Sequence, residues 1–394
     1  MNKNGNNEGS IRKRANGKWE ARYTDGRAPD GRQIQRSIYG KTRKEVAEKL
    51  NEILYQKQTG TYVTPQKLLL KVWLVQWLKN YAEITVRPST YISYEGYVHN
   101  HISPALGMIP IQQITPVMIQ NFYNQKFESG RADGKGGLSA KTIRNLHNML
   151  HQAMEQAKVN GLILHNPADN AVIPKQEKKE MRVLSVEEQR RLLQTIHLHR
   201  LGFAILLDLA TGLRIGELCA LKWSDVNFNK QTIKISRTLQ RIKKSMGEKI
   251  SGSGNTAILE GNVKTNSGFR EIPIPDNVFA MLLQHRENQQ AEKDYCGTAY
   301  QDHGYIFAMP LGTCVEPSTM RDVLNYLLEA AGIEHVNFHA LRHTFATRAI
   351  ENGVNVKTLS DILGHSQVQI TMDLYCHTSL DLMRESMNKM AGLF

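Results

Sequence analysis

The spacing of the apolar residues between positions 61 and 173 limits what the chain can fold into. There they recur every three or four residues, which places them on one face of a helix. Two segments have this spacing most clearly: Leu69, Leu70, Trp73, Leu74, Trp77, Leu78 and Tyr81, then Ile143, Leu146, Leu150, Ala153, Met154 and Ala157. Helix starts are predicted at Thr115, which precedes Pro116, and at Ser139. We therefore expect a helical bundle, with the Gly-rich residues 130–137 as a loop between two of its helices.

The pattern of residues 10–40 is different. Alternating apolar and polar side chains, with three Asn-Gly or Asp-Gly pairs, predict a small antiparallel sheet with tight turns. Thr42 and Glu45 have the spacing of a capping box, which begins a helix that covers the sheet. The alternation places Trp19, Ala21 and Tyr23 toward that helix and Lys18, Glu20 and Arg22 outward.

The charge of the chain indicates a polyanionic partner. The formal net charge is +13 and the pI about 9.4, and residues 1–60 hold 14 Lys and Arg against 7 Asp and Glu. Charge of this size attracts phosphate, in DNA or in RNA. Two interpretations of the N-terminal charge stay open: a solvated basic face, or a three-stranded sheet that lays basic side chains into a DNA groove. The candidate DNA contacts are Arg12, Lys13, Arg14, Lys18, Arg22 and Arg36.

Cysteine usage and hydropathy argue against a secreted protein or a membrane protein. The four cysteines form no Cys-x-x-Cys pair, which disfavours a zinc ribbon and a disulfide framework. The first residues lack the apolar core of a signal peptide, and no run of about 18 apolar residues occurs. We expect a soluble, cytoplasmic protein with no membrane partner.

A polar, aperiodic stretch separates the bundle from the last part of the chain. It covers residues 174–180, and we place the linker at residues 174–183. Beyond it, Ser185 and Glu188 form a second predicted capping box, and residues 203–210 form a strongly apolar predicted helix. A separate folded domain is expected to begin here.

That last part mixes helix and strand signals. Residues 231–236 are predicted to be a strand, and a Gly/Ser-rich stretch, residues 246–255, precedes a predicted hairpin over residues 263–274. The closing segment is predicted to be helical, with Gly353 and Gly364 at the ends of helices. These signals predict a mixed α/β domain.

Five residues of this part form a set suited to a phosphodiester. His339 and Arg342 share one predicted helix face, a spacing that by itself is more typical of a solvated helix. The full set is far less likely to occur by chance than this pair alone. It adds Arg214 after a Thr-Gly turn, His365 after a predicted glycine cap and the late Tyr375. Because the arginine fork holds two phosphate oxygens at once, Arg214 and Arg342 are the predicted clamps.

The tyrosine of this set needs activation, since only about one phenol in a thousand is ionised at pH 7. A positive pocket lowers the pKa of a phenol, and His339 can accept the proton of Tyr375. The departing 5′ oxygen needs a proton, which Lys264 in the predicted hairpin can donate. His365 is expected to hydrogen-bond a phosphate oxygen.

A metal site is the main alternative chemistry. His339 and His343 are four residues apart, as two zinc ligands on a helix would be, but Ala340 stands where a zinc hydrolase has Glu. No cluster of Asp and Glu suggests a two-magnesium nuclease. We therefore predict neither a metal nor any other cofactor.

The motifs around these residues resemble those of tyrosine recombinases, in particular integrases of phages and of conjugative transposons of Gram-positive bacteria. The matching residues are Thr211, Gly212, Leu213 and Arg214; Val263, Lys264 and Thr265; His339, Ala340, Leu341, Arg342 and His343; Leu363, Gly364 and His365; Leu374, Tyr375, Cys376 and His377. The resemblance implies six catalytic residues: Arg214, Lys264, His339, Arg342, His365 and Tyr375. It also implies that Glu217 supports the first arginine from a buried position.

The same resemblance implies a multidomain fold that is mostly α-helical with small β-sheets. A three-stranded sheet plus a helix, residues 1–61, would bind arm-type DNA sites, and a helical bundle, residues 62–173, would bind core-type sites. A mixed α/β catalytic domain would follow the linker and occupy residues 184–394.

The reaction that the resemblance implies is a transesterification without metal or ATP. It would integrate and excise a mobile element through a 3′-phosphotyrosine, as a homotetramer on two DNA duplexes at the bacterial nucleoid. An excisionase or a DNA-bending protein is the expected accessory partner. Two alternatives remain: a type IB topoisomerase, which a separate arm-binding domain disfavours, and a catalytically silent DNA-binding regulator, which the six intact positions disfavour.

Overall fold

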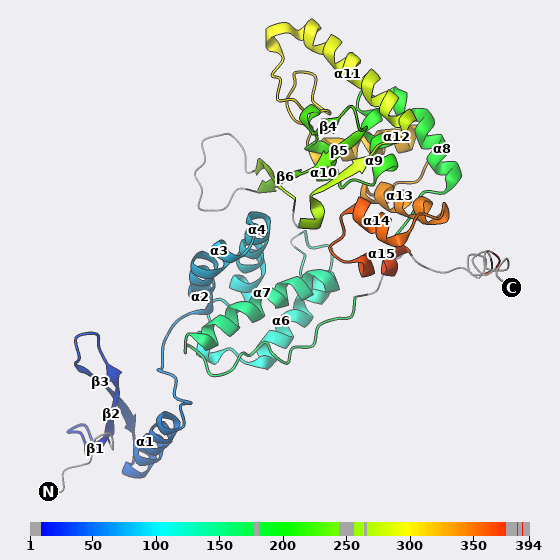
Figure 1. Cartoon of the computed structure of the whole chain (residues 1–394). Coiled ribbons are helices and arrows are strands. Elements are labelled where there is room, and N and C mark those ends of the chain that lie inside the picture. The colour runs from blue at the N-terminus through cyan, green and yellow to red at the C-terminus, as the bar shows by residue number, and fades with distance from the viewer. Residues whose placement is uncertain are drawn as a thin grey trace. The chain divides into compact units, whose positions relative to one another are not determined.

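The structure, a computed structural model, describes residues 9–131, 133–176, 181–243, 256–263 and 266–375, together with Arg384 and Asn388. For residues 243, 266 and 373–375 it describes the backbone alone. The chain forms two compact units, Met1–Glu177 and Lys178–Phe394 (Figure 1). None of the described helices is both long enough and apolar enough to cross a membrane.

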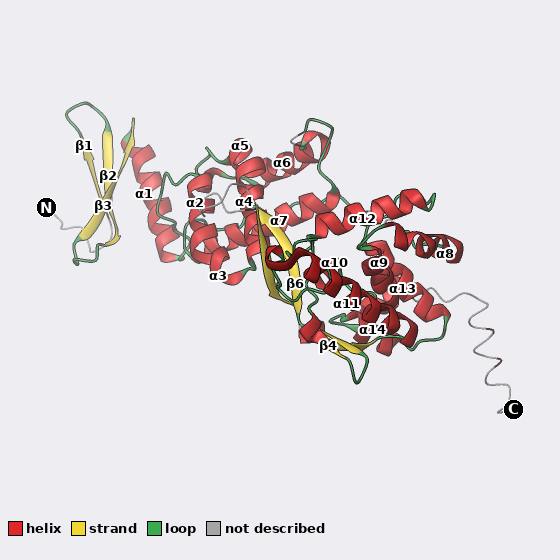
Figure 2. Cartoon of the chain, turned by 90° about the horizontal axis from the view of Figure 1, so that it is seen from above, coloured by secondary structure: helices red, strands yellow, loops and turns green. Residues whose placement is uncertain are grey.

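The N-terminal sheet and its helix are confirmed. Strands β1 (Ser10–Lys13), β2 (Trp19–Arg27) and β3 (Gln33–Gly40) pair antiparallel in the order β1-β2-β3, and α1 (Arg43–Gln58) follows (Figure 2). The Thr42 hydroxyl accepts from the Glu45 N–H at 3.1 Å, as the capping box predicts. A small apolar core lies between one face of the sheet and α1: Ala21, Tyr23, Val46 and Leu50, with Ile11, Trp19 and Ile38 at its edge.

The predicted helical part is also confirmed. Its elements are α2 (Leu70–Trp77), η1 (Leu78–Ala82), α3 (Glu83–Thr85), α4 (Pro88–Tyr97), η2 (Val98–Ile102), α5 (Ser103–Leu106), η3 (Ile111–Gln113), α6 (Pro116–Ser129) and α7 (Ala140–Val159). The side chains of Thr115 and Ser139 cap α6 and α7, respectively. Inside the core, the Trp73 indole N–H donates to the Ala153 carbonyl at 2.9 Å, which joins α2 to α7. The two apolar stripes in the sequence therefore face one another in a common core.

The second unit combines helices with two small sheets. Its elements are α8 (Val186–Thr195), η4 (Ile196–Leu198), α9 (Gly202–Thr211), α10 (Ile215–Cys219), η5 (Trp223–Asp225), β4 (Val226–Asn227), β5 (Thr232–Ile235), β6 (Arg237–Lys243), β7 (Thr256–Asn262), η6 (Asn266–Gly268), β8 (Arg270–Pro273), α11 (Asp276–Cys296), η7 (Gly297–Ala299), α12 (Pro317–Ala330), α13 (His339–Glu351), α14 (Val356–Leu363) and α15 (Val368–Tyr375). Strands β4, β5 and β8 form one sheet, and β6 pairs with β7 in the other.

The hairpin predicted over residues 263–274 is wrong. Strand β7 pairs backward with β6, while β8 joins the other sheet beside β5. The polar, glycine-containing residues before β8 suggested a hairpin turn, but part of them forms the short 3₁₀ helix η6. Ile272 in β8 is almost fully buried beside Ile233, because that pairing places both side chains in the main core.

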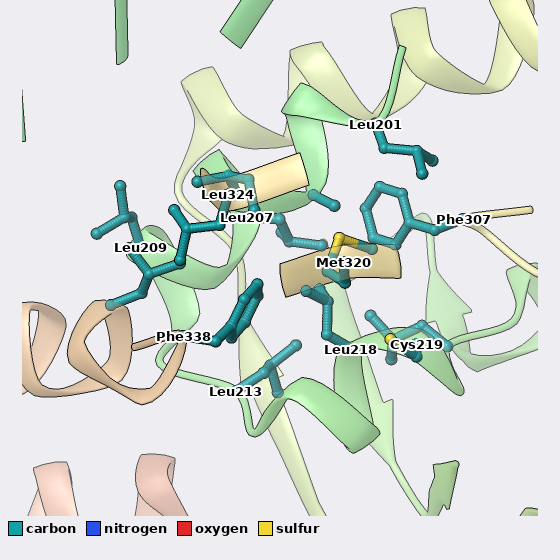
Figure 3. Packing of buried hydrophobic residues seen from close by; sticks show 14 of the residues in the cluster. Leu201, Leu207, Leu209, Leu213, Leu218, Cys219, Phe307, Met320, Leu324 and Phe338 are labelled. Atoms are coloured by element: carbon teal, nitrogen blue, oxygen red, sulfur yellow. The ribbon is translucent and has the colours of Figure 1, made fainter. Parts of the chain in front are cut away.

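The main core of the second unit anchors the chain on either side of the candidate catalytic residues. Leu213 and Leu218, which flank the segment with Arg214, point into the same apolar cluster as Phe338 (Figure 3). Phe338 directly precedes His339 at the start of α13. Since side chains in such a core pack densely, these neighbours fix the backbone from which the polar groups extend.

Candidate active site

A glycine turn places Arg214 at the start of α10. Gly212 ends α9 with φ of +61°, and a Cβ atom at this position would lie 2.4 Å from the ring of Phe345. A larger residue would therefore be both strained and too close to α13. The chain then extends through Arg214, whose own N–H donates to a carboxylate oxygen of Glu217 at 3.1 Å.

Glu217 is the buried centre of an arginine network. It accepts from Arg214 Nη1 at 2.7 Å and from Arg270 at 2.8 and 3.3 Å, and its side chain is 3% exposed. Burial alone would raise the pKa of Glu217, but the hydrogen bonds and charge of Arg270, and then those of Arg214, hold it below the ordinary value. The carboxylate therefore stays ionised and fixes the orientation of Arg214.

Arg270 is a residue that the sequence analysis missed. Its Nε donates to the carbonyl of Ile362 at 2.6 Å, so the same guanidinium joins β8 to the end of α14. A signal for it was present in the alternation of the strand. Arg270 has the same parity as Ile272 and Ile274, both of which are buried, and a charged residue on a buried strand face needs a partner.

Arg342 is buried under the site, with 1% of the residue exposed. Its two Nη nitrogens donate to the carbonyls of Gly212 and Leu363, each at 2.7 Å. Arg342 thus joins the C-terminal ends of α9 and α14. The last carbonyls of a helix have no N–H partner within it, so these ends carry partial negative charge that favours a cation.

The histidines of α13 form a pair. The rings of His339 and His343 lie edge to face with 4.5 Å between their centroids. Partial withdrawal from water, with the charges of Arg342 and Arg214, lowers the pKa of His339 even though the residue keeps an exposed side. Burial, followed by the effect of His339, lowers the pKa of His343 to about 4. Both imidazoles are neutral at pH 7.

His365 is fixed by a second glycine turn. Gly364 ends α14 with φ of +64°, and the His365 N–H donates back to the carbonyl of Ser360 at 3.1 Å. Its Nδ1 lies 2.8 Å from the hydroxyl of Thr371 in α15, the helix that ends at Tyr375. Burial and then the charge of Arg342 lower the pKa of His365 to about 4.

A groove of about 780 Å³ opens over Arg214 and His365, whereas His339 and His343 line a separate hollow of about 490 Å³. Arg214, Thr238, Arg241, Gly268 and His365 are among the residues that line the groove. Arg214 Nη2 donates to the carbonyl of Gly364 at 3.2 Å and Arg342 to that of Leu363 at 2.7 Å, so both guanidiniums lie at the turn that carries His365. The charges of the same two arginines also lower the pKa values of His339 and His365. Lys264 and the side chain of Tyr375 lie outside the described residues, and so do residues 177–180 of the predicted linker. Within the described residues no cluster of His, Cys, Asp and Glu is suited to a metal ion.

The structure brings together three of the six candidate DNA contacts of the N-terminal sheet. Arg12, Arg14 and Arg22 converge on Glu20 on the face away from α1. Arg36 has the opposite parity and is paired with the carboxylate of Asp25. Two lysines of the set lie elsewhere. Lys13 shares the helix-side parity of Ile11, and Lys18 is exposed in the turn before β2.

A mostly helical fold in which two arginines and a neutral histidine meet beside a groove, and in which α15 reaches a tyrosine, is typical of enzymes that cut and rejoin DNA strands. Residues 182–380 match the phage integrase family, and residues 69–127 match the phage integrase N-terminal SAM-like domain. The chain belongs to the phage integrase family. It is a tyrosine recombinase of the type found in phages and conjugative transposons. The comparisons favour neither the topoisomerase nor the silent regulator.

Relatives and solved structures match over most of the chain. The XerC-like tyrosine recombinase of Caldanaerobacter subterraneus subsp. tengcongensis is 34% identical and the alignment covers 92% of this chain and 93% of that protein. The ICEBs1 integrase of Bacillus subtilis is 24% identical over 98% of this chain and 100% of the relative. The Tn1549 transposon integrase in complex with circular intermediate DNA has the same fold, with a TM-score of 0.66 and 24% identity over 82% of this chain and 100% of that one. A lambda integrase tetramer bound to a Holliday junction has a TM-score of 0.56 and 19% identity, with 94% and 96% of the two chains covered.

Proposed function

We propose that Tyr375 is the nucleophile of a site-specific recombination reaction that integrates and excises a mobile element. Its phenolic oxygen attacks the scissile phosphorus while His339 accepts the phenolic proton. The bond to the 5′ oxygen breaks, and Lys264 supplies the proton that this oxygen takes. The products are a 3′-phosphotyrosine and a free 5′ hydroxyl. A 5′ hydroxyl of the partner duplex then attacks the phosphotyrosine, so the number of phosphodiester bonds is conserved and no ATP is consumed.

Two arginines and His365 hold the phosphate in this proposal. Arg214 and Arg342 donate to the non-bridging oxygens, where charge shifts as the fifth ligand approaches phosphorus. His365 donates through Nε2, which requires Nδ1 to accept from the Thr371 hydroxyl at 2.8 Å. A single observation carries this assignment: the carbonyls of Gly364 and Leu363 and the carboxylate of Glu217 hold both guanidiniums at the turn that carries His365.

The low pKa of His339 supports its role as the base. A protonated imidazole accepts no proton, and partial burial, followed by the charge of Arg342, lowers the pKa of this ring and favours its neutral form. The same positive surroundings would favour the phenolate of Tyr375 as it forms.

We further propose that the rest of the chain delivers DNA to this site. Residues 62–173 would hold core-type DNA, residues 1–61 an arm-type site, and residues 174–183 would link the bundle to the catalytic residues 184–394. Four copies would act on two duplexes, with an excisionase or a DNA-bending protein as the accessory partner, and the arm-site contact would set the direction of recombination. Support comes from lambda integrase, which was solved as a dimer on a core site and as a tetramer on a Holliday junction.

A nicked core-site substrate tests the nucleophile. On this substrate the cleaved end diffuses away, so the wild-type chain should accumulate as a covalent protein–DNA adduct. Tyr375→Phe removes only the phenolic oxygen and should bind the same DNA without forming the adduct. Tyr326→Phe, at an exposed position on α12, is the matched control and should react as the wild type does. An undiminished adduct from Tyr375→Phe would falsify the assignment.

A further inference from the structure

Glu20 in β2 is a buried carboxylate outside the active site, and three arginines surround it. Arg12 Nε donates to it at 2.7 Å, Arg14 Nε at 2.9 Å and Arg22 Nε at 3.2 Å, and Arg14 adds an Nη2 bond at 3.2 Å. The Glu20 side chain is 0% exposed, although the arginines themselves are 41–52% exposed. It is therefore covered by guanidiniums and not by the apolar core, which lies on the other face of the sheet.

Register explains why these groups meet. Glu20 lies opposite Arg12 in β1 and Tyr39 in β3, while Arg22 lies opposite Ser37. Side chains of paired residues project from the same face, so a single carboxylate can be reached from all three strands. The Ser37 hydroxyl donates a further bond at 2.7 Å, and the Arg14 guanidinium lies over the Tyr39 ring, 5.2 Å from its centroid. The hydrogen bond from Arg14, followed by that from Ser37, holds the pKa of Glu20 well below its usual range.

The atoms that bind Glu20 differ among the arginines. Arg12 and Arg22 use Nε, and within the described residues neither uses an Nη nitrogen for a hydrogen bond. The edge formed by the two Nη groups of each is then available on the solvent side, in an orientation that the carboxylate fixes. A fixed arginine loses less conformational entropy on binding than a mobile one.

We propose that Glu20 is a positioning residue that orients Arg12 and Arg22 to recognise guanine in the arm-type DNA site. Guanine presents O6 and N7 side by side in the major groove, and the two-nitrogen edge of an arginine matches them. An anion beneath a DNA-facing surface weakens its attraction for phosphate, which carries no sequence information, whereas a fixed orientation favours contact with the edge of a base. This inference rests on the proposed arm-binding function of residues 1–61.

Because Glu20 is negatively charged, removing its charge changes DNA affinity in opposite directions under the two explanations. Glu20→Gln keeps the size of the side chain and removes one negative charge from a DNA-facing surface. If electrostatics alone mattered, the variant would bind every duplex more tightly. If Glu20 positions the arginines, the variant binds its specific site less tightly relative to random DNA.

The experiment uses the full-length chain and an arm-type duplex. The duplex is found by selection from a random-sequence pool, and footprinting separates it from the core-type site. Each of its guanines is then replaced in turn by 7-deazaguanine, which lacks the N7 acceptor. Wild type should lose about tenfold in affinity at two or more guanines, the scale of a bidentate arginine–guanine contact. Glu20→Gln should lose most of that sensitivity, whereas Glu48→Gln, the same change at an exposed site in α1, should keep it.

A double-mutant cycle covers the case in which Glu20→Gln damages the domain. Arg12→Lys and Arg22→Lys keep Glu20, the charge and the Arg14 contacts, and each should abolish sensitivity at one guanine. Adding Glu20→Gln to either lysine variant should cause little further loss of sensitivity at that guanine, because both changes remove the same interaction. Full 7-deaza sensitivity in Glu20→Gln, or in both lysine variants, overturns the positioning role and leaves arm binding intact. If wild type protects no arm-type sequence at all, the proposed arm function itself fails.

Discussion

Arg270 donates to both carboxylate oxygens of Glu217, at 2.8 and 3.3 Å, although the two residues are 53 positions apart. Both side chains are almost fully buried, at 6% and 3% exposure. The pair joins the β8 strand to the start of α10, where Arg214 begins the helix. The orientation of a candidate catalytic arginine therefore depends on a second arginine that lies beneath it.

Arg270→Met should destabilise the second unit strongly. Removing one partner of a buried ion pair costs about 3–5 kcal/mol, because the remaining charge loses compensation. Strand cleavage should fall as well, since Arg214 loses its fixed support. Equilibrium urea unfolding measures the first effect. Lys357→Met, which breaks the exposed pair with Asp361, is the control and should cost less than about 0.5 kcal/mol. Equal costs for the two variants would contradict the structural role of Arg270.

Arg214→Lys and Arg342→Lys should each slow cleavage by about 10²-fold or more, because lysine keeps the charge but not the fork. They should differ in stability. Arg342 is 1% exposed and joins two helix ends, so its lysine variant should also unfold more easily, whereas the Arg214 side chain is 41% exposed. Single-turnover cleavage and thermal unfolding separate the two effects. Arg241→Lys, in the same groove but paired with Glu316, is the control and should cleave at nearly the wild-type rate.

Stability should decrease as the pH falls from 6.5 toward 4. The pKa of His343 is lowered from 6.5 to about 4 by burial, so over this range the unfolded chain binds a proton that the folded chain does not. This difference lowers the free energy of unfolding by up to about 3 kcal/mol as the pH falls to 4. The lowered pKa of His365 acts in the same direction. Above pH 6.5 the contribution is constant. His343→Asn should flatten the slope of unfolding free energy against pH, and exposed His335→Asn should not.

Thr371→Val should reduce cleavage without changing DNA affinity. The variant keeps the shape of a fully buried side chain but removes the hydroxyl that bonds His365 Nδ1. His365 can then adopt the tautomer whose Nε2 carries no hydrogen, which cannot donate to phosphate. Single-turnover cleavage on saturating core DNA measures the effect. Thr358→Val on α14, whose side chain is exposed, is the matched control. An unchanged rate in Thr371→Val would show that the hydroxyl does not select the tautomer.

Lys264→Ala should be rescued by sulfur in place of the bridging 5′ oxygen. A thiolate leaves without a proton, so the general acid becomes unnecessary. Cleavage of the oxygen substrate should drop sharply, whereas cleavage of the sulfur substrate should approach that of the wild type. Lys234→Ala, at an exposed position in β5, should cleave both substrates normally. Equal defects on the two substrates would assign proton donation to Lys243, Lys244 or Lys249 instead, or give Lys264 a structural role.

The sequence by itself determined the features that depend on neighbouring residues. The predicted helix starts at Thr42, Thr115, Ser139 and Ser185 are confirmed because each cap bonds to an N–H only three residues away. Apolar periodicity likewise predicted the faces that pack, since a helix or strand presents them at fixed intervals. The short motifs around Arg214, His339, Arg342, His365 and Tyr375 were specific enough to predict the family.

Only the tertiary structure decided which distant polar groups meet. The pairing of β8 with β5 instead of β7, and with it the contact of Arg270 with Glu217, depends on burying Ile272 in the main core. Glu20 was expected to face solvent, and the alternation placed it on the correct face, but three arginines cover it because strand register brings them together. The spacing of charged residues along the chain does not predict which distant residue each will pair with. Their burial follows from the packing of the apolar residues around them.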